Sequence, residues 1–175
     1  ATPPLTPAER NRVALVALYA ATSGRLWSTN GYSSANTNWL TDMPCRSDGS
    51  DWQHITCDGD DVENVVVDLF WPGDFRGTLP TQLGMLSLAS CADGDVCGQL
   101  HVDSQKFLTG TIPTQLALIP GLRDIDVSGR SATCGSSLGC AEYLSGTLPT
   151  QLALVPTLEK FSIQLNLVSG TIPSE

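Results

Sequence analysis

The segment Gly170-Thr171-Ile172-Pro173 is the last of four copies of one short motif. The same Gly-Thr-[Leu/Ile]-Pro pattern begins at Gly77, Gly110 and Gly146, so that the copies lie 33, 36 and 24 residues apart. A motif that recurs every roughly 20 to 50 residues is typical of a solenoid, in which each repeat forms one coil. The sequence therefore predicts a stack of coils that share a single core.

The shortest interval shows what one coil contains. Phe161 and Ile163 alternate in the way that a short strand with one buried face requires. Asn166 stands where a buried amide side chain would bond the backbone of the turn, Val168 returns to the core, and Gly170 permits the next bend. A coil of this kind is stable only when neighbouring coils stack on both sides of it.

The two longer intervals carry insertions that contain cysteines. Cys91 and Cys97 precede the strand of their coil, whereas Cys134 and Cys140 follow the strand of theirs. We expect each pair to close a loop, and the two loops to project from different sides of the solenoid, where ordered insertions often shape a binding face.

All six cysteines fall into close pairs, the third being Cys45 and Cys57. The sequence alone does not fix their connectivity, but local pairing is the simplest choice because each pair brackets a loop with Gly or Asp. Zinc is disfavoured, since there is no C-x-x-C and neither His54 nor His101 has ligand spacing around it. Disulfides indicate an oxidising compartment, so we expect a secreted, extracellular or cell-surface protein.

The first 64 residues are expected to form a cap over the end of the solenoid, followed by about four repeats over 65–175, the last of them incomplete. Thr6-Pro7-Ala8-Glu9 reads as a capping box, which predicts a helix from about Pro7 to Ala21 that stops near Gly24. The helix residues expected to face the solenoid are Val13, Val16, Leu18 and Tyr19. The tryptophans expected to fill the cap are Trp27, Trp39 and Trp52.

Cap and repeats together resemble plant-type leucine-rich-repeat proteins. The run from Ala14-Leu15 through the three tryptophans, Cys45 and Cys57 is similar to the N-terminal cap of that group, which includes receptor-like ectodomains and polygalacturonase-inhibiting proteins. The resemblance implies an α/β solenoid, a right-handed superhelix with parallel strands on its concave face. Three features depart from the usual pattern: His54 before the second cap cysteine, the cysteine-closed insertions and the lack of any Asn-x-Ser/Thr sequon. The last two favour an algal or protist source.

The charge is −9 and is concentrated between residues 42 and 74, where nine acidic residues face a single base, Arg46. Such a surface repels nucleic acid and anionic lipid, so we expect neither as a partner. It attracts basic partners or Ca²⁺, although a solvated acidic face is the simpler interpretation. No apolar run approaches the about 20 residues that span a bilayer, so membrane insertion is not expected.

Catalysis is not indicated. Gly135-Ser136-Ser137-Leu138-Gly139 matches the G-x-S-x-G pattern, but it lies in a short loop between cysteines and not at a strand-to-helix turn. The acidic turns near Asp58 and Asp93 lack the spacing of an EF-hand. The sequence therefore predicts a protein that is not an enzyme and that has no metal site and no cofactor.

A ligand is expected on the concave face, because residues between the inward positions of each strand point to that side. Val67, Leu100, Ile125 and Phe161 are taken as the first inward residues. The candidate binding residues are then Phe70, Trp71, His101, Asp103, Asp126, Ser128 and Gln164.

Two functions fit these features. The first is an extracellular recognition module that binds a protein, peptide or glycan through the concave face and the disulfide loops. The alternative is a structural subunit of a cell wall, surface fibre or larger assembly, which self-associates through the apolar end of the last repeat.

Overall fold

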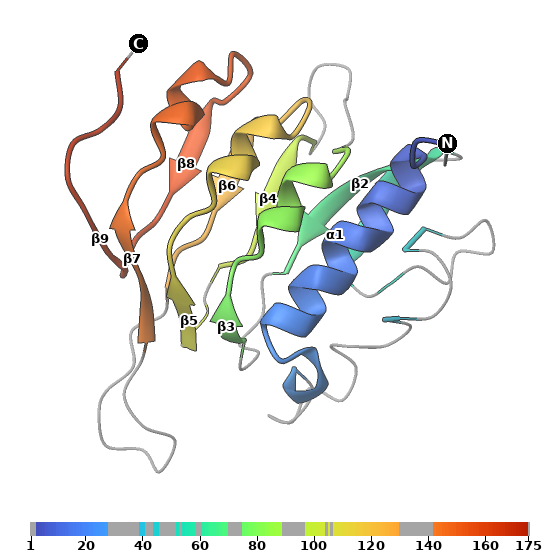
Figure 1. Cartoon of the computed structure of the whole chain (residues 1–175), viewed down its shortest axis with the longest axis horizontal. Helices are drawn as coiled ribbons and strands as arrows, with labels where there is room; N and C mark the ends of the chain where they lie inside the picture. The colour runs from blue at the N-terminus through green and yellow to red at the C-terminus, as the bar shows by residue number, and fades with distance from the viewer. Residues whose placement is uncertain are drawn as a thin grey trace.

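The computed structural model describes residues 3–27, 39–40, 44–45, 52, 54–58, 61–69, 75–88, 97–103, 105, 107–129 and 142–174. These residues form a row of stacked coils with a helix at one end (Figure 1). The predicted leucine-rich-repeat fold is confirmed: each coil contributes one strand to each of two sheets, and neighbouring coils pair in parallel.

The strands of the coils form two sheets. The first has the order β1-β2-β4-β6-β8, and the second has the order β3-β5-β7-β9. The first sheet consists of β1 (Ile55–Asp58), β2 (Asp61–Asp68), β4 (Gln99–His101), β6 (Asp124–Asp126) and β8 (Lys160–Ser162). The second consists of β3 (Arg76–Thr78), β5 (Phe107–Gly110), β7 (Glu142–Thr147) and β9 (Leu167–Ser169).

Short 3₁₀ helices connect the strands on the side away from the first sheet. They are η2 (Thr81–Met85), η3 (Thr114–Leu118) and η4 (Thr150–Leu154), each following a Gly-Thr-[Leu/Ile]-Pro motif. A further 3₁₀ turn, η1 (Gly24–Leu26), follows the cap helix α1 (Pro7–Ala21). In Figure 1 the helices α1, η2, η3 and η4 stand side by side in one row in front of the first sheet.

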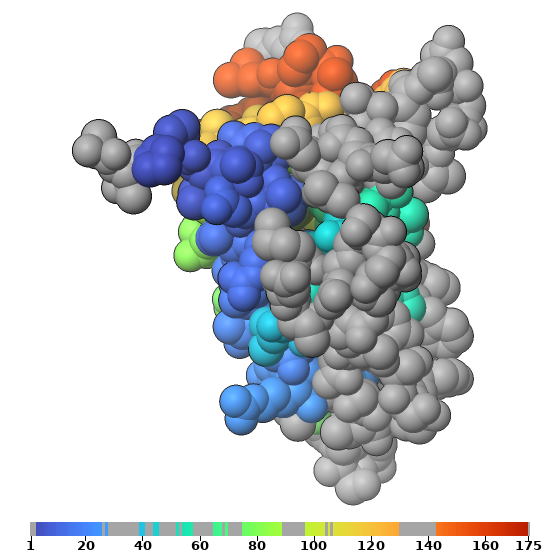
Figure 2. Space-filling model, turned by 90° about the vertical axis from the view of Figure 1, so that its right-hand side faces the viewer, coloured from blue at the N-terminus to red at the C-terminus, as the bar shows by residue number. Residues whose placement is uncertain are grey.

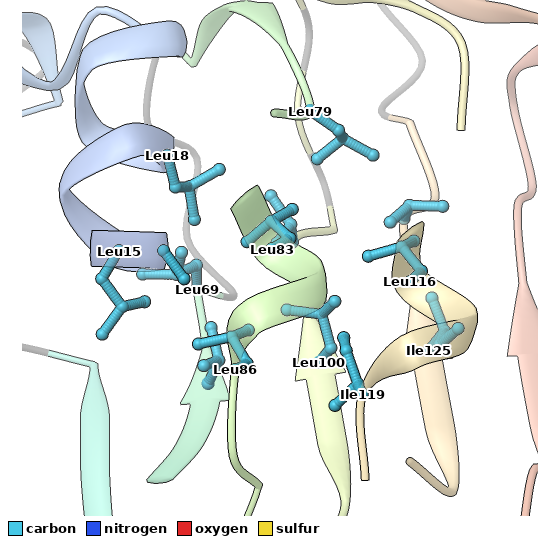
Figure 3. Close-up of a cluster of buried hydrophobic side chains, with 14 of the residues drawn as sticks. Leu15, Leu18, Leu69, Leu79, Leu83, Leu86, Leu100, Leu116, Ile119 and Ile125 are labelled. Atoms are coloured by element: carbon cyan, nitrogen blue, oxygen red, sulfur yellow. The ribbon is translucent and has the colours of Figure 1, made fainter. Parts of the chain in front are cut away.

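The expected register of the inward residues is confirmed. Val67 pairs with Leu100, Leu100 with Ile125, and Ile125 with Phe161 on adjacent parallel strands. These residues belong to or pack against one continuous apolar core that runs from the cap through the coils. Leucines of the 3₁₀ helices, such as Leu83 and Leu116, meet the strand residues from the other side (Figure 3).

The Gly-Thr pair of the motif locks each coil to the next. Gly146 has a φ of +85°, which favours glycine, and a Cβ built on it would lie 3.1 Å from the methyl carbon of Thr111 in the preceding coil. Gly110 stands in the same relation to Thr78. The motif therefore needs glycine for two reasons, the backbone turn and the close approach of the neighbouring coil.

Helix α1 begins with the predicted capping box. The Thr6 Oγ1 accepts a hydrogen bond from the Glu9 backbone N–H at 3.2 Å, and the Glu9 carboxylate accepts one from the Thr6 N–H at 2.8 Å. The hydrogen bond from the Thr6 backbone is the main reason why the pKa of Glu9 is lowered. The helix lies over the solenoid end, which faces the viewer in Figure 2.

The prediction of the buried face of α1 was wrong in part. Leu18 is buried, and Val16 and Tyr19 are partly buried and pack against the core as expected, but Val13 is 37% exposed. The buried stripe instead consists of Asn11, Ala14, Leu15 and Leu18, which follow the spacing i, i+3, i+4, i+7. Asn11 belongs to this stripe because its Oδ1 accepts a hydrogen bond from the backbone N–H of Ser87 at 2.7 Å.

The predicted aromatic filling of the cap is confirmed. Trp27, Trp39 and Trp52 are all buried and contact one another in a chain, with centroids 4.8 and 5.0 Å apart. The predicted Cys45–Cys57 disulfide is present. Cys97 is also disulfide-bonded, while its expected partner Cys91 and the pair Cys134 and Cys140 lie outside the described residues.

Asn166 takes the role that its position predicted. Its Nδ2 donates to the Val127 carbonyl at 2.9 Å, and its Oδ1 accepts from the backbone N–H of Leu144 at 3.0 Å. In an earlier coil, the buried Gln105 donates to the carbonyls of Leu69 and Asp103. These amide side chains satisfy backbone groups of turns that stacked coils remove from water.

Candidate functional site

The candidate site is the outer side of strands β4, β6 and β8, here called the concave face. Because alternate residues of a strand point to opposite sides, the residues on both sides of each inward residue share this face. The strand register aligns them in two rows. The rows are Gln99–Asp124–Lys160 and His101–Asp126–Ser162.

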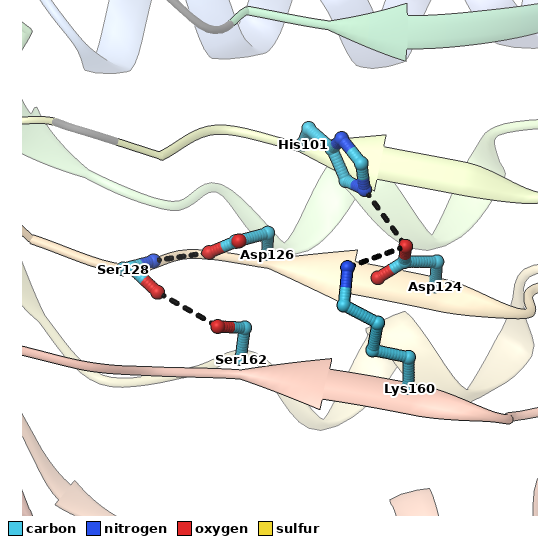
Figure 4. Close-up of polar contacts among 6 residues, drawn as sticks. All are labelled: His101, Asp124, Asp126, Ser128, Lys160 and Ser162. Atoms are coloured by element: carbon cyan, nitrogen blue, oxygen red, sulfur yellow. Dashed lines mark hydrogen bonds and ion pairs between the residues drawn. The ribbon is translucent and has the colours of Figure 1, made fainter.

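Asp124 stands at the centre of the face and holds side chains from both neighbouring strands. Its Oδ2 lies 3.2 Å from Nε2 of His101 on β4 and 3.1 Å from Nζ of Lys160 on β8 (Figure 4). The Asp124 side chain is only 15% exposed, whereas that of Lys160 is 61% exposed. A mostly buried carboxylate is thus held between two basic side chains at the solvent boundary.

Asp124 and Lys160 were not among the predicted binding residues. Those residues were taken only after each first inward residue, although the residue before it also points outward. Alternation alone would have found both positions. What alternation does not give is their pairing, because that depends on which residue of β6 lies opposite which residue of β8.

Lys160 experiences a strongly acidic environment. The pKa of Lys160 is raised, first by its hydrogen bond to Asp124 and the charge of that carboxylate, and further by the charges of Asp126 and Asp103. Three carboxylates, two on β6 and one just after β4, therefore act on one ammonium group. The concave face is negative around Lys160.

A second group of polar side chains continues the face beyond the strand ends. The hydroxyls of Ser128 and Ser162 lie 3.0 Å apart, and the backbone N–H of Gln164 donates to the Ser128 hydroxyl at 3.2 Å. The Ser128 N–H donates to the Asp126 carboxylate at 2.9 Å. These bonds fix the serine hydroxyls against other groups of the face.

Five of the seven predicted binding residues lie in the described part of this face. The hydrogen bonds from Val102 N–H to the Asp126 carbonyl and from Val127 N–H to the Ser162 carbonyl continue the parallel register past the strand ends. The five are His101, Asp103, Asp126, Ser128 and Gln164. The other two, Phe70 and Trp71, lie outside the described residues.

The described residues contain neither a cluster of metal ligands nor a membrane-spanning helix. Within them, no group of three or more His, Cys, Asp or Glu side chains is arranged to hold a metal ion. None of the helices described is both long enough and apolar enough to cross a membrane.

A second surface, here called the threonine–glutamine face, lies on the side of the 3₁₀ helices. In η2, η3 and η4, the first threonine hydroxyl donates to the neighbouring glutamine Oε1, at 3.4, 3.2 and 3.4 Å. The motif threonines just before each helix are exposed as well. The face comprises Thr78, Thr81, Gln82, Thr111, Thr114, Gln115, Thr147, Thr150 and Gln151.

The C-terminal end of the solenoid is apolar. A groove of about 370 Å³ there is lined by residues of the last coils, among them Leu152, Phe161 and Ile172. Ile172 is 84% exposed, and Leu167 on the last strand, β9, is 65% exposed. At the opposite end, helix α1 covers the equivalent surface of the first coil.

Solved structures with the same fold show what the chain is similar to. It matches the crystal structure of PEPR1–AtPEP1 with a TM-score of 0.61 and 19% identity, covering 93% of this chain and 19% of that one. It matches a plant ice-binding protein with a TM-score of 0.54 and 18% identity, covering 91% of this chain and 49% of that one. The chain thus spans about a fifth of the length of the first protein and about half of the length of the second.

A weaker similarity, with a TM-score of 0.48 and 21% identity, is to the BIR3–SERK2 complex from Arabidopsis thaliana, covering 92% of this chain and 84% of that one. No protein-family model matches the sequence, and no curated protein matches it. At these identities the structural matches establish the leucine-rich-repeat fold and nothing finer.

Proposed function

We propose that this protein is an extracellular, non-catalytic recognition module that binds a protein or peptide through the concave face. A glycan is the alternative ligand for the same face. The proposal is carried by one observation: side chains from three neighbouring strands meet at Asp124, where His101 and Lys160 both contact the same carboxylate oxygen.

This arrangement favours binding because it is already ordered. Side chains that hold one another in place lose little further freedom when a ligand arrives, and this reduces the entropic cost of association. Asp126, Ser128 and Ser162 extend the same ordered array along the strands. The result is a shallow row of donors and acceptors suited to an extended ligand that lies across the strands.

The location outside the cell is supported by the disulfides. Cys45 and Cys57 are bonded in the cap, and Cys97 is bonded in the first insertion. Disulfides persist mainly in oxidising compartments. The fold shared with PEPR1, which was crystallised with AtPEP1, agrees with a role in recognition.

Selection of displayed random peptides against the immobilised chain tests the proposal, with the affinity of the selected peptides measured by calorimetry. Gln164→Lys places a bulky cation on the exposed end of the concave face. We expect it to weaken binding of the selected peptides about tenfold, the effect of roughly 1.4 kcal/mol. Asp126→Lys should have a similar effect.

The matched control is Thr56→Lys, which adds the same charge to an exposed residue of β1 in the cap. It should leave peptide binding unchanged. Selected peptides that bind all three variants as well as the unaltered chain would refute recognition by the concave face. Oligosaccharides that bind the chain and are lost in the two concave variants, where peptides are not, would identify a glycan as the ligand.

We propose a second function, binding to ice, which the threonine–glutamine face favours. The same exposed Thr-x-x-Thr-Gln pattern occurs in three successive coils, and the same threonine–glutamine hydrogen bond forms in each. The plant ice-binding protein shares the fold of this chain. Measurement of thermal hysteresis, the lowering of the freezing point below the melting point, tests this function directly.

A further inference from the structure

Resting on the second function proposed above, we infer that the threonine–glutamine face is the surface that contacts ice and that the concave face takes no part in it. The two faces lie on opposite sides of the coils, one on the 3₁₀ helices and the other on the first sheet (Figure 1). They therefore offer two independent binding surfaces on one small solenoid.

The first feature of the face is its lack of charged residues. The segments 77–88, 110–122 and 146–158 contain no Asp, Glu, Lys or Arg, although the chain has 18 acidic and 9 basic residues elsewhere. A charged group orients the water around it in a shell that does not fit a crystal lattice. A surface without charges leaves its hydration water free to adopt lattice positions.

The second feature of the face is its repeat along the stack. Strands β3, β5, β7 and β9 pair in parallel, which spaces successive coils by about 4.8 Å. Thr78 pairs with Thr109 and Thr147 with Ser169, so each motif threonine is offset by two residues along the strands from that of the next coil. The methyl groups of Thr78, Thr111 and Thr147 each pack against the glycine of the next coil. Each motif threonine is thus held in a similar place on its coil by contact with the next coil.

The third feature of the face is the chemistry of its threonine side chains. Threonine offers a hydroxyl that can bond to a lattice water and a methyl group beside it that makes no competing hydrogen bond. In Thr81, Thr114 and Thr150 the hydroxyl bonds in the same way to a glutamine, so that the three coils present one repeated polar pattern.

These features distinguish ice from a protein as the occupant. Protein interfaces are anchored mainly by aromatic side chains and arginine set into pockets. The three charge-free segments contain no Trp, Tyr, Phe or Arg. What the face supplies is repetition of small contacts over an area, which matches a crystalline surface.

Thermal hysteresis and uptake of the labelled chain into a growing ice hemisphere test the inference with three variants. Thr114→Lys places a charge in the middle row of the face, and we expect it to abolish most of the hysteresis and most of the uptake. Thr56→Lys makes the same exchange on the cap strand β1 and should change neither. Circular dichroism verifies that the variants are folded.

The outcomes separate the function from its site. If the unaltered chain shows neither hysteresis nor uptake, the proposed ice-binding function is wrong. If the chain binds ice and Thr114→Lys binds equally well, the function stands and the assignment to the threonine–glutamine face is overturned. Loss of ice binding in Gln164→Lys would move the site to the concave face and would equally overturn the assignment.

Discussion

The ammonium group of Lys160 lies 3.1 Å from the Asp124 carboxylate, which links β8 to β6 across the concave face. The pKa of Lys160 is raised, mainly by this hydrogen bond. A raised pKa in the folded state means that the pair contributes to stability below the unfolded value near 10.4 and that the contribution is lost as the pH rises through the folded value. The pair is therefore formed at neutral pH.

An NMR titration of the lysine side-chain carbons should show Lys160 losing its proton at a higher pH than an unperturbed lysine. Asp124→Asn removes the charge and most of the interaction, and should bring the pKa of Lys160 back toward its ordinary value. Equal pKa values in the two proteins would show that the ion pair does not form in solution.

The contact between Gly146 and Thr111 predicts a coupled effect on stability. Gly146→Ala forces alanine into a backbone with φ of +85° and brings its Cβ to 3.1 Å from the Thr111 methyl. We expect a loss of more than the roughly 1–2 kcal/mol that the left-handed conformation alone costs. Urea denaturation measures it.

Gly121 provides the matched control, since its φ is +71° and a Cβ there would meet no atom within 4 Å. Gly121→Ala should lower the free energy of unfolding only by the cost of the left-handed conformation. Thr111→Ser removes the methyl group and should recover part of the loss in Gly146→Ala, with a coupling of about 0.5 kcal/mol or more. Additive effects of the two substitutions would contradict the contact.

The bond between Asn11 and Ser87 predicts that the cap is docked by a polar group within its apolar face. Asn11→Leu adds apolar volume but leaves the Ser87 backbone N–H without this acceptor. We expect a loss of about 1 kcal/mol, the low end of the cost of an unsatisfied donor, because Ser87 is only half-buried. Hydrogen exchange at Ser87 should accelerate at the same time, and unchanged protection there would argue against the bond.

The apolar C-terminal end predicts self-association of the 175-residue chain, as proposed for the structural-subunit alternative. Ile172→Glu charges an exposed side chain of the groove, and sedimentation velocity over a concentration series should show it shifting the chain toward the monomer. Leu118→Glu is the control, because Leu118 is similarly exposed at 69% but lies on η3 and not at the end. A chain that stays monomeric at all concentrations would remove the alternative.

Much of the fold could be predicted because the repeat constrains itself. Four Gly-Thr-[Leu/Ile]-Pro motifs set the phase of every coil, and the inward residues Val67, Leu100, Ile125 and Phe161 followed from that phase. The capping box at Thr6 and Glu9 is local in sequence, so it too could be predicted. Local sequence patterns of this kind can be interpreted without knowledge of the rest of the molecule.

The buried face of α1 was predicted less well, because only apolar residues of the helix were expected to be buried. Val13 was expected to be buried, yet the helix buries Asn11, whose Oδ1 accepts a hydrogen bond from the backbone N–H of Ser87, far along the chain. A buried polar residue is explained only by its partner. No local pattern names that partner.

The sequence by itself determined that this chain forms stacked coils, where each coil turns, and which residues face the core, because those properties repeat with the chain. Only the tertiary structure decided that Asp124 meets both His101 and Lys160, and that each motif threonine packs on the next glycine. Such meetings depend on the lateral register between coils, which hydrogen bonding between strands sets and which the order of residues along one strand does not encode.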